Sequence, residues 1–271
     1  MNVKRMLGVA MMMAALTLIG RPVQAAIISD IILIVDESGS MGDVQANLRT
    51  NIGTFAAILA AGGVDARFGL VGYGNNSIRP RMLTDLTDPA GFATAAQGLS
   101  TNGGTEPGYS GVAFGLNAID GQSALFSFRP GALKNLILFT DEPSNGDNCN
   151  GCLTGGNATT LADVNALLAA DTALFNAVLR EPSTINSYGA LATGHGGHVY
   201  DLNGLNTSNQ SVVQQFVLDF SNSKLQETRD FCTLNPTAPA CQGVTVPEPA
   251  SMALFSIAAG AAAMRRRRTR A

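Results

Sequence analysis

Carboxylate and hydroxyl side chains gather in three short, widely separated segments of the 271-residue chain. The segments are Asp36-Glu37-Ser38-Gly39-Ser40, Gly103-Gly104-Thr105 and Thr140-Asp141-Glu142. Such oxygen ligands suit a hard divalent cation, because Mg²⁺ is held in a near-octahedral shell by one or two carboxylates together with other oxygens and water. We therefore predict one oxygen-lined cation site, with Mg²⁺ as the preferred ion and Mn²⁺ or Ca²⁺ as alternatives.

Unbroken apolar runs precede two of these segments. Residues 31–35 lead into Asp36, and residues 136–139 lead into Thr140 and Asp141. Runs of this kind are typical of parallel strands that are buried on both faces. Ligands of open α/β sheets bind at the carboxyl ends of the strands. Both aspartates are therefore expected at the same edge of one sheet.

The order of these features resembles a von Willebrand factor type A domain over residues 29–231. The resemblance implies a single domain of the α/β class, with a doubly wound, mostly parallel sheet flanked by helices. It also implies that the family's metal-ion-dependent adhesion site falls on Asp36, Ser38, Ser40, Thr105 and Asp141. In such a site the hydroxyls ligate the metal directly, the aspartates act directly or through water, and one position is open to a partner's carboxylate. Taken alone, Asp-x-Ser-x-Ser would be interpreted as an Asx turn that caps the following helix.

Hydrophobic periodicity predicts the other elements of an alternating chain. A helix after Asp43 carries one apolar face, formed by Leu48, Ile52, Phe55 and Leu59. We also predict strands over 68–73, 78–83 (an edge strand), 173–179 and 199–200, and helices over 111–119, 161–168 and 212–220. The segment 142–160 is rich in Gly, Asn and Asp and has no apolar period, so it is either functional, as a determinant of partner specificity, or a mobile insertion.

The first 26 residues have the pattern of a secretory signal peptide. Lys4-Arg5 precedes an apolar stretch over 6–19, and small residues follow at 23–26. The apolar stretch is shorter than the roughly 20 residues that a transmembrane helix needs, which disfavours an N-terminal anchor. We predict that the chain is exported and that the domain occupies residues 27–231.

Residues 246–271 form a tripartite tail that resembles the PEP-CTERM sorting signal. Pro247-Glu248-Pro249 is followed by an apolar stretch over 252–264 and by four arginines at 265–268. The resemblance implies that an exosortase-type membrane protease recognises Pro247, Glu248 and Pro249. An apolar helix followed by a cationic cluster stops transfer and keeps the arginines in the cytoplasm. We expect a transmembrane helix that anchors the protein transiently, with the domain on the cell surface or released. An ordinary C-terminal anchor is the alternative, but it leaves Pro-Glu-Pro unexplained.

Almost all of the negative charge of the chain lies in the region between these two terminal segments. Eight of the 17 basic residues and one of the 20 acidic residues lie in the two terminal segments, so the remaining domain carries a net charge of about −10. A strongly acidic surface repels the phosphates of nucleic acid and anionic lipid. We predict no nucleic-acid partner.

The four cysteines form two local pairs. Export favours disulfides over free thiols. We predict the pairs Cys149–Cys152 and Cys232–Cys241. The first pair follows the Asp141 loop at the sheet edge where the metal site is predicted, hereafter the metal edge, and the second follows the last helix, so pairing between them would be geometrically poor. The alternatives are a zinc site of all four cysteines and a redox-active pair at Cys149 and Cys152. Residues 232–245 are small and polar with two prolines, which predicts a linker.

These observations predict an exported binding or adhesion module and not an enzyme. The order Ser40, Asp141, His198 matches an α/β-hydrolase triad, but Ser38 stands where the nucleophile elbow requires glycine. His195 and His198 are interpreted as part of a glycine-rich turn, with a metal-binding pair as the alternative. The predicted partner is a protein or matrix ligand that offers a carboxylate to the metal. A structural matrix protein with a stabilising metal is the other alternative.

Overall fold

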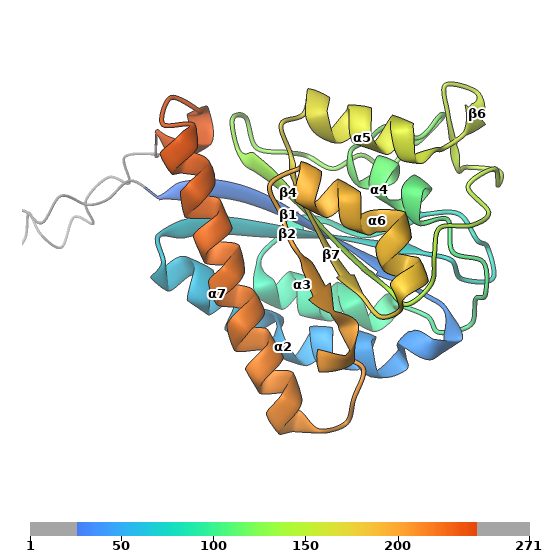
Figure 1. Ribbon diagram of the computed structural model, residues 1–271, viewed down its shortest axis with the longest axis horizontal. Coiled ribbons are helices and arrows are strands. Elements are labelled where there is room, and N and C mark those ends of the chain that lie inside the picture. The colour runs from blue at the N-terminus through green and yellow to red at the C-terminus, as the bar shows by residue number, and fades with distance from the viewer. Residues whose placement is uncertain (1–25, 243–271) are drawn as a thin grey trace, which may run out of the picture. The chain divides into compact units, whose positions relative to one another are not determined.

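The computed structural model describes residues 26–242 and shows a six-stranded sheet between two layers of helices (Figure 1). The strand order is β3-β2-β1-β4-β7-β8, and every neighbouring pair is parallel except β2 with β3. The strands are β1 (Ile27–Asp36), β2 (Val64–Tyr73), β3 (Arg81–Thr87), β4 (Leu133–Thr140), β7 (Leu174–Leu179) and β8 (Val199–Asp201). This is the doubly wound α/β fold predicted from the sequence.

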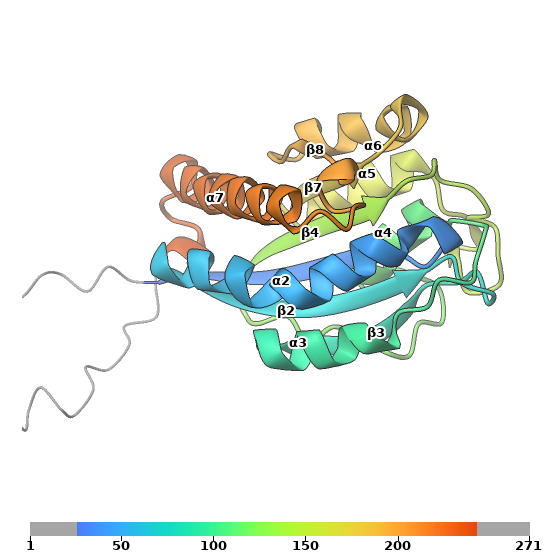
Figure 2. The ribbon, with the colours of Figure 1, turned by 90° about the horizontal axis from the view of Figure 1, so that it is seen from below.

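Alternate residues of β1 explain the two helical layers. Ile31 and Leu33 point into one core, against α2 (Gly42–Ala61), α3 (Pro89–Ala95) and α7 (Gln210–Leu234). On the other face, Ile32 and Ile34 pack against α4 (Gly108–Gly115), α5 (Leu161–Ala170) and α6 (Pro182–Gly194). Figures 1 and 2 show the two sets of helices on opposite sides of the sheet. Because both faces of the central strands are covered, the strands are apolar throughout instead of alternating.

The strongly periodic elements of the prediction are confirmed, and the others differ at their ends. The predicted edge strand starts at Arg81 instead of 78, because Ile78 adopts a φ of 63° that a strand does not allow. The predicted helix over 111–119 runs instead over Gly108–Gly115 and is followed by Asn117 at φ 62°. Helices α3 and α6 were not predicted from the sequence. Helix α6 is rich in Ser, Thr and Gly, which have weak helix propensity, and its helical form depends on the burial of a face that contains Tyr188 and Leu191.

The long segment after Asp141 contains a small hairpin of β5 (Leu153–Thr154) and β6 (Asn157–Ala158). Cys149 is bonded to Cys152 just before this hairpin, and Cys232 is bonded to Cys241 at the end of the domain. These are the same pairs that the sequence predicted. All four sulfurs are engaged in disulfides, so neither the zinc site nor a free dithiol is formed.

Residues 232–241 differ from the linker that we predicted. Helix α7 continues to Leu234, and a short 3₁₀ helix, η4 (Pro239–Cys241), packs the buried Ala240 against Leu133 and Leu174. The Cys232–Cys241 disulfide closes this segment, which explains how a stretch with little apolar content is held against the sheet. Within the described part of the chain, no helix combines the length and apolarity that a bilayer span requires. The predicted signal peptide and the sorting tail, with its transmembrane helix, lie outside the described residues.

Candidate metal site

Asp36 ends β1 and is completely buried, and its carboxylate organises the turn that follows. Its Oδ1 accepts a hydrogen bond from the Ser38 backbone N–H at 2.7 Å, as in an Asx turn. Its Oδ2 accepts a hydrogen bond from the Thr140 hydroxyl at 2.8 Å. Thr140 is the last residue of β4, the strand beside β1. The pairing of β1 with β4 therefore brings two of the three sequence segments together.

Ser38, Ser40 and Asp141 form a chain of close oxygen atoms. The Ser38 and Ser40 hydroxyl oxygens lie 3.2 Å apart, and the Ser40 hydroxyl donates to Asp141 Oδ1 at 3.0 Å. Neighbouring ligands of an octahedral Mg²⁺ ion, at Mg–O distances of about 2.0–2.1 Å, are separated by roughly 3 Å. The oxygen spacing fits such an ion.

The Thr105 loop reaches the site through a close backbone approach. Gly103 forms a β-bridge with Ser38, and its backbone passes so near to Gly74 that a Cβ atom at position 103 would lie 1.5 Å from the Gly74 carbonyl oxygen. Gly74, at φ 79°, borders both the Thr105 carbonyl oxygen and Asp36 Oδ1. Thr105 is therefore beside the other predicted ligands. No hydrogen bond within residues 26–242 ties its hydroxyl to those four side chains.

The charge balance of the site also suits a cation. Burial raises the pKa of Asp36 to about 7, although hydrogen bonds from Ser38 and Thr140 oppose this effect. None of the ion pairs within residues 26–242 includes Asp36. A buried carboxylate without a positive partner is costly, and a bound metal ion would compensate its charge. The described residues contain no group of three or more His, Cys, Asp or Glu side chains placed to hold a metal. An ion at the predicted residues would need the serine and threonine hydroxyls as ligands.

Two charged residues at this edge were missed by the sequence analysis. Arg180 follows β7 and contacts Asp141 Oδ2 at 3.3 Å, with its own side chain 39% exposed. Glu106 is buried next to Thr105, and burial followed by the charges of Glu142 and Asp141 raises its pKa. Neither residue belongs to the three-segment motif, and only the sheet order places Arg180 near Asp141.

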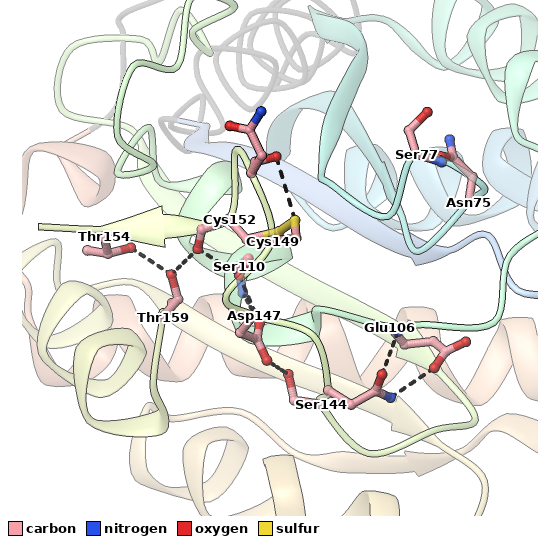
Figure 3. Close-up of a disulfide and its surroundings, with 12 residues drawn as sticks. Asn75, Ser77, Glu106, Ser110, Ser144, Asp147, Cys149, Cys152, Thr154 and Thr159 are labelled. Atoms are coloured by element: carbon pink, nitrogen blue, oxygen red, sulfur yellow. Dashed lines mark hydrogen bonds between the residues drawn. A yellow bond between two sulfur atoms is a disulfide. The ribbon is translucent and has the colours of Figure 1, made fainter. Parts of the chain in front are cut away.

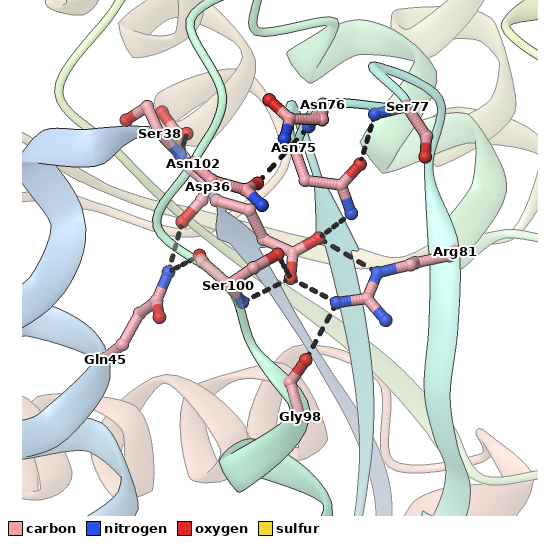
Figure 4. Close-up of polar contacts among 11 residues, drawn as sticks. Asp36, Ser38, Gln45, Asn75, Asn76, Ser77, Arg81, Gly98, Ser100 and Asn102 are labelled. Atoms are coloured by element: carbon pink, nitrogen blue, oxygen red, sulfur yellow. Dashed lines mark hydrogen bonds and ion pairs between the residues drawn. The ribbon is translucent and has the colours of Figure 1, made fainter.

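Glu37 lies between Asp36 and Ser38, two of the predicted ligands, and its side chain contacts Arg81, Asn75 and Ser100, which are labelled in Figure 4. Its fully buried carboxylate accepts hydrogen bonds from Arg81 Nε at 3.0 Å, from Asn75 Nδ2 at 2.8 Å and from the Ser100 backbone N–H at 2.8 Å. A second Arg81 nitrogen completes a bidentate ion pair, the stronger geometry for such contacts. Glu37 therefore joins β1 to β3 and to the loop that leads to Thr105.

The segment 142–160 is held beside the site by polar contacts (Figure 3). Asp147 accepts hydrogen bonds from the Ser110 N–H and hydroxyl and from the Ser144 hydroxyl, at 2.7–2.9 Å. Asn145 donates to Glu106 Oε2 at 2.9 Å. The segment 142–160, which was predicted to be either functional or a mobile insertion, is thus hydrogen-bonded to Glu106, the residue that follows Thr105.

The histidines do not join the metal edge. His198 Nδ1 is 2.7 Å from Glu227 of α7, and His195 Nε2 is 2.9 Å from Asn165. The two rings have different partners, and His198 does not contact Ser40, whose hydroxyl contacts Ser38 and Asp141. The hydrolase triad is therefore not assembled.

Comparison with known families agrees with this geometry. Residues 30–215 match the von Willebrand factor type A domain, which is more than half of the sequence. The chain belongs to the von Willebrand factor type A (VWA) domain family. Residues 245–268 match the PEP-CTERM protein-sorting motif, which indicates export to the cell envelope. No curated protein matches the sequence.

Two solved structures resemble this VWA chain at low sequence identity. The vWF domain of the type V pili tip protein Mfa5 from Porphyromonas gingivalis is 13% identical with a TM-score of 0.46, over 73% of this chain and 97% of its own. Proximal thread matrix protein 1 (PTMP1) from the mussel byssus is 17% identical with a TM-score of 0.48, over 70% of this chain and 48% of its own. Similarity at this level says nothing about function, and the family assignment rests on the sequence match.

Proposed function

We propose that this VWA domain is a non-enzymatic adhesion module that binds a protein or matrix ligand through a divalent cation. Asp36, Ser38, Ser40, Thr105 and Asp141 would hold the ion, with Mg²⁺ preferred and Mn²⁺ or Ca²⁺ as substitutes. The observation that carries the proposal is the buried Asp36 carboxylate, which lacks an ion-pair partner among residues 26–242 and faces oxygens spaced as in an octahedral shell. When bound, the cation would supply a Lewis-acidic position for a carboxylate of the ligand.

Arg180 supports the choice of an acidic ligand. Its guanidinium lies beside Asp141 and is partly exposed. A carboxylate bound to the cation through one oxygen could receive a charge-assisted hydrogen bond from Arg180 at the other. The segment 142–160 is hydrogen-bonded to Glu106 and Ser110, and its Gly146 lies against the Thr105 side chain. We propose that it would select among acidic ligands.

The sorting motif defines the setting of this module. We propose that an exosortase-type protease recognises Pro247-Glu248-Pro249 and that the apolar segment after it anchors the chain transiently. The domain would then act at the cell surface or in the extracellular matrix.

Titration calorimetry of the exported protein with MgCl₂, MnCl₂ and CaCl₂ tests the metal site. We expect saturable binding by the wild type and none by Asp141→Ala. Glu142→Gln is the matched control, because it removes a neighbouring exposed negative charge without removing a ligand. Equal binding by wild type and Asp141→Ala would refute the site. Binding of metal with no metal-dependent binding of acidic peptides or matrix polysaccharide would favour a structural matrix protein instead.

A further inference from the structure

A lysine, an asparagine and a glutamate meet inside the domain, away from the metal edge. Lys224 of α7 is fully buried, and its Nζ donates a hydrogen bond to Asn135 Oδ1 of β4 at 3.0 Å. The same Nζ donates to the Glu227 carboxylate, one turn further along α7. The register neighbours of Asn135 are Ile31 and Leu174, both buried, so the contact between Lys224 and Asn135 lies among apolar side chains.

Only the oxygen of the Asn135 side-chain amide is hydrogen-bonded. Its carbonyl oxygen is engaged by Lys224, while its buried Nδ2 has no hydrogen-bond partner among residues 26–242. Buried polar nitrogens are nearly always paired, so this one calls for an explanation. The Lys224 amine therefore lies beside the Asn135 carbonyl group, and no described residue holds the amide nitrogen in place.

We propose that Lys224 and Asn135 form an intramolecular isopeptide bond and that Glu227 moves the proton. The Lys224 Nζ lone pair attacks Asn135 Cγ, and a C–N bond forms. The Cγ–Nδ2 bond breaks, Glu227 carries a proton from Nζ to the departing nitrogen, and ammonia leaves. The amine and amide become a secondary amide plus ammonia, so the reaction needs no oxidant, reductant or other co-reactant.

The surroundings suit each role. Burial lowers the pKa of Lys224 against the opposing effect of Glu227, which favours the neutral, nucleophilic amine. Glu227 Oε1 accepts from the Tyr200 hydroxyl at 2.8 Å and is 2.7 Å from His198 Nδ1, so its Oε2 is directed toward Lys224. His198 and Tyr200 thus orient the carboxylate that accepts the proton.

The bond would tie α7 to β4, the strand that leads to Asp141. This consequence rests on the proposed function, whereas the bond itself does not. A ligand at the metal edge pulls on the end of β4, and α7 connects the domain to the C-terminal sorting segment. A covalent link between the two would carry that load across the helix–sheet contact.

Peptide mapping of the protein purified after expression of the full-length chain tests the bond. After reduction, trypsin cuts behind Lys134, Arg180 and Arg229 but not behind an acylated lysine. We expect one branched species in which residues 135–180 are joined to residues 181–229, lighter than the two peptides together by one ammonia. Cyclisation at Asn145-Gly146 would also release ammonia, but it leaves Lys224 cleavable and the peptides unbranched. Complete cleavage behind Lys224 in the folded wild type would overturn the proposal.

Variants then assign the roles. Lys224→Met is expected to abolish the branched peptide, whereas Lys134→Met, a neighbouring lysine on β4, should retain the bond. Glu227→Gln keeps both reacting groups but removes the proton acceptor. It should slow crosslinking at least about tenfold, given the ~10²–10⁴-fold that a positioned acid–base group contributes. Crosslinking of Glu227→Gln at the wild-type rate would overturn the role of Glu227.

Discussion

Two buried carboxylates of this domain, Asp36 and Glu227, are balanced in different ways. Asp36 accepts hydrogen bonds from the neutral groups of Ser38 and Thr140, and burial raises its pKa to about 7. Burial also raises the pKa of Glu227, but the ammonium of Lys224 outweighs this and leaves it below its usual value. Before the proposed bond forms, Lys224 supplies a cation at Glu227, whereas no ion pair within residues 26–242 supplies one at Asp36.

Their locations explain the difference. Asp36 ends a strand at the edge where loops converge, and Ser40, four residues further on, is exposed to solvent. Glu227 lies between α7 and the sheet, next to the completely buried Lys224. A positive charge at that depth has to belong to the chain itself. The comparison favours a ligand site at the buried carboxylate that lacks a positive partner and ends a strand. It favours an internal role for the one that has such a partner in a helix–sheet contact.

Replacing Lys224 is the strongest way to break this comparison. Lys224→Met removes the nitrogen that Glu227 contacts, which is charged before the proposed bond forms and an amide N–H after it. It also removes the crosslink, so we expect the free energy of unfolding to fall by about 3–5 kcal/mol or more. Urea denaturation measures this loss. The double variant Lys224→Met/Glu227→Gln should recover part of it, because no unpaired charge remains. A single variant as stable as wild type would show that Lys224 does not balance Glu227.

The pH dependence of the free energy of unfolding tests whether Asp36 is buried without a positive partner. With a chelator present, the folded state holds the Asp36 proton more tightly than the unfolded state, because the pKa rises from 3.8 to about 7. Raising the pH through this window therefore lowers the free energy of unfolding, by up to about 4 kcal/mol. Asp36→Asn lacks this contribution. Urea titrations at several pH values should show the difference between the two proteins, and parallel pH profiles would contradict the assignment.

Metal binding should compensate Asp36 as Lys224 compensates Glu227. Mg²⁺ at 100 times its Kd is expected to raise the free energy of unfolding of the wild type by about 2.7 kcal/mol. Asp141→Ala should show no such gain, and Glu142→Gln should keep it. Thermal melts with Mg²⁺ and with chelator provide the measurement. A gain that persists in Asp141→Ala would place the ion elsewhere.

Replacing Arg180 measures how much its positive charge already compensates Asp141. Because Arg180 is partly exposed, its interaction with Asp141 is worth less than about 1 kcal/mol, and Arg180→Gln should tighten cation binding by less than about fivefold. Binding of an acidic ligand to the metal-loaded protein should weaken instead. Calorimetry measures both effects, with the exposed Arg67→Gln as the control. A loss of cation affinity in Arg180→Gln would be the opposite of this expectation.

Much of the fold could be predicted because its signals are local. Short stretches of sequence specify single elements: the apolar runs before Asp36 and Thr140 specify β1 and β4, and the apolar face after Asp43 specifies α2. Helix α6 was missed because its composition resembles a loop, and it is helical through burial of Tyr188 and Leu191. The folding of residues 232–241 was missed because it depends on the Cys232–Cys241 disulfide and on contacts with distant strands.

The sequence by itself indicated the residue types of the candidate site, the cysteine pairs and the two strands that end at Asp36 and Thr140. Those features are encoded by residue type and by spacing along short stretches. Only the tertiary structure decided which side chains surround them. Arg180 reaches Asp141 because β7 lies beside β4, and Lys224 reaches Asn135 because α7 crosses the sheet. These pairs are 39 and 89 residues apart, and no local pattern records contacts of that range.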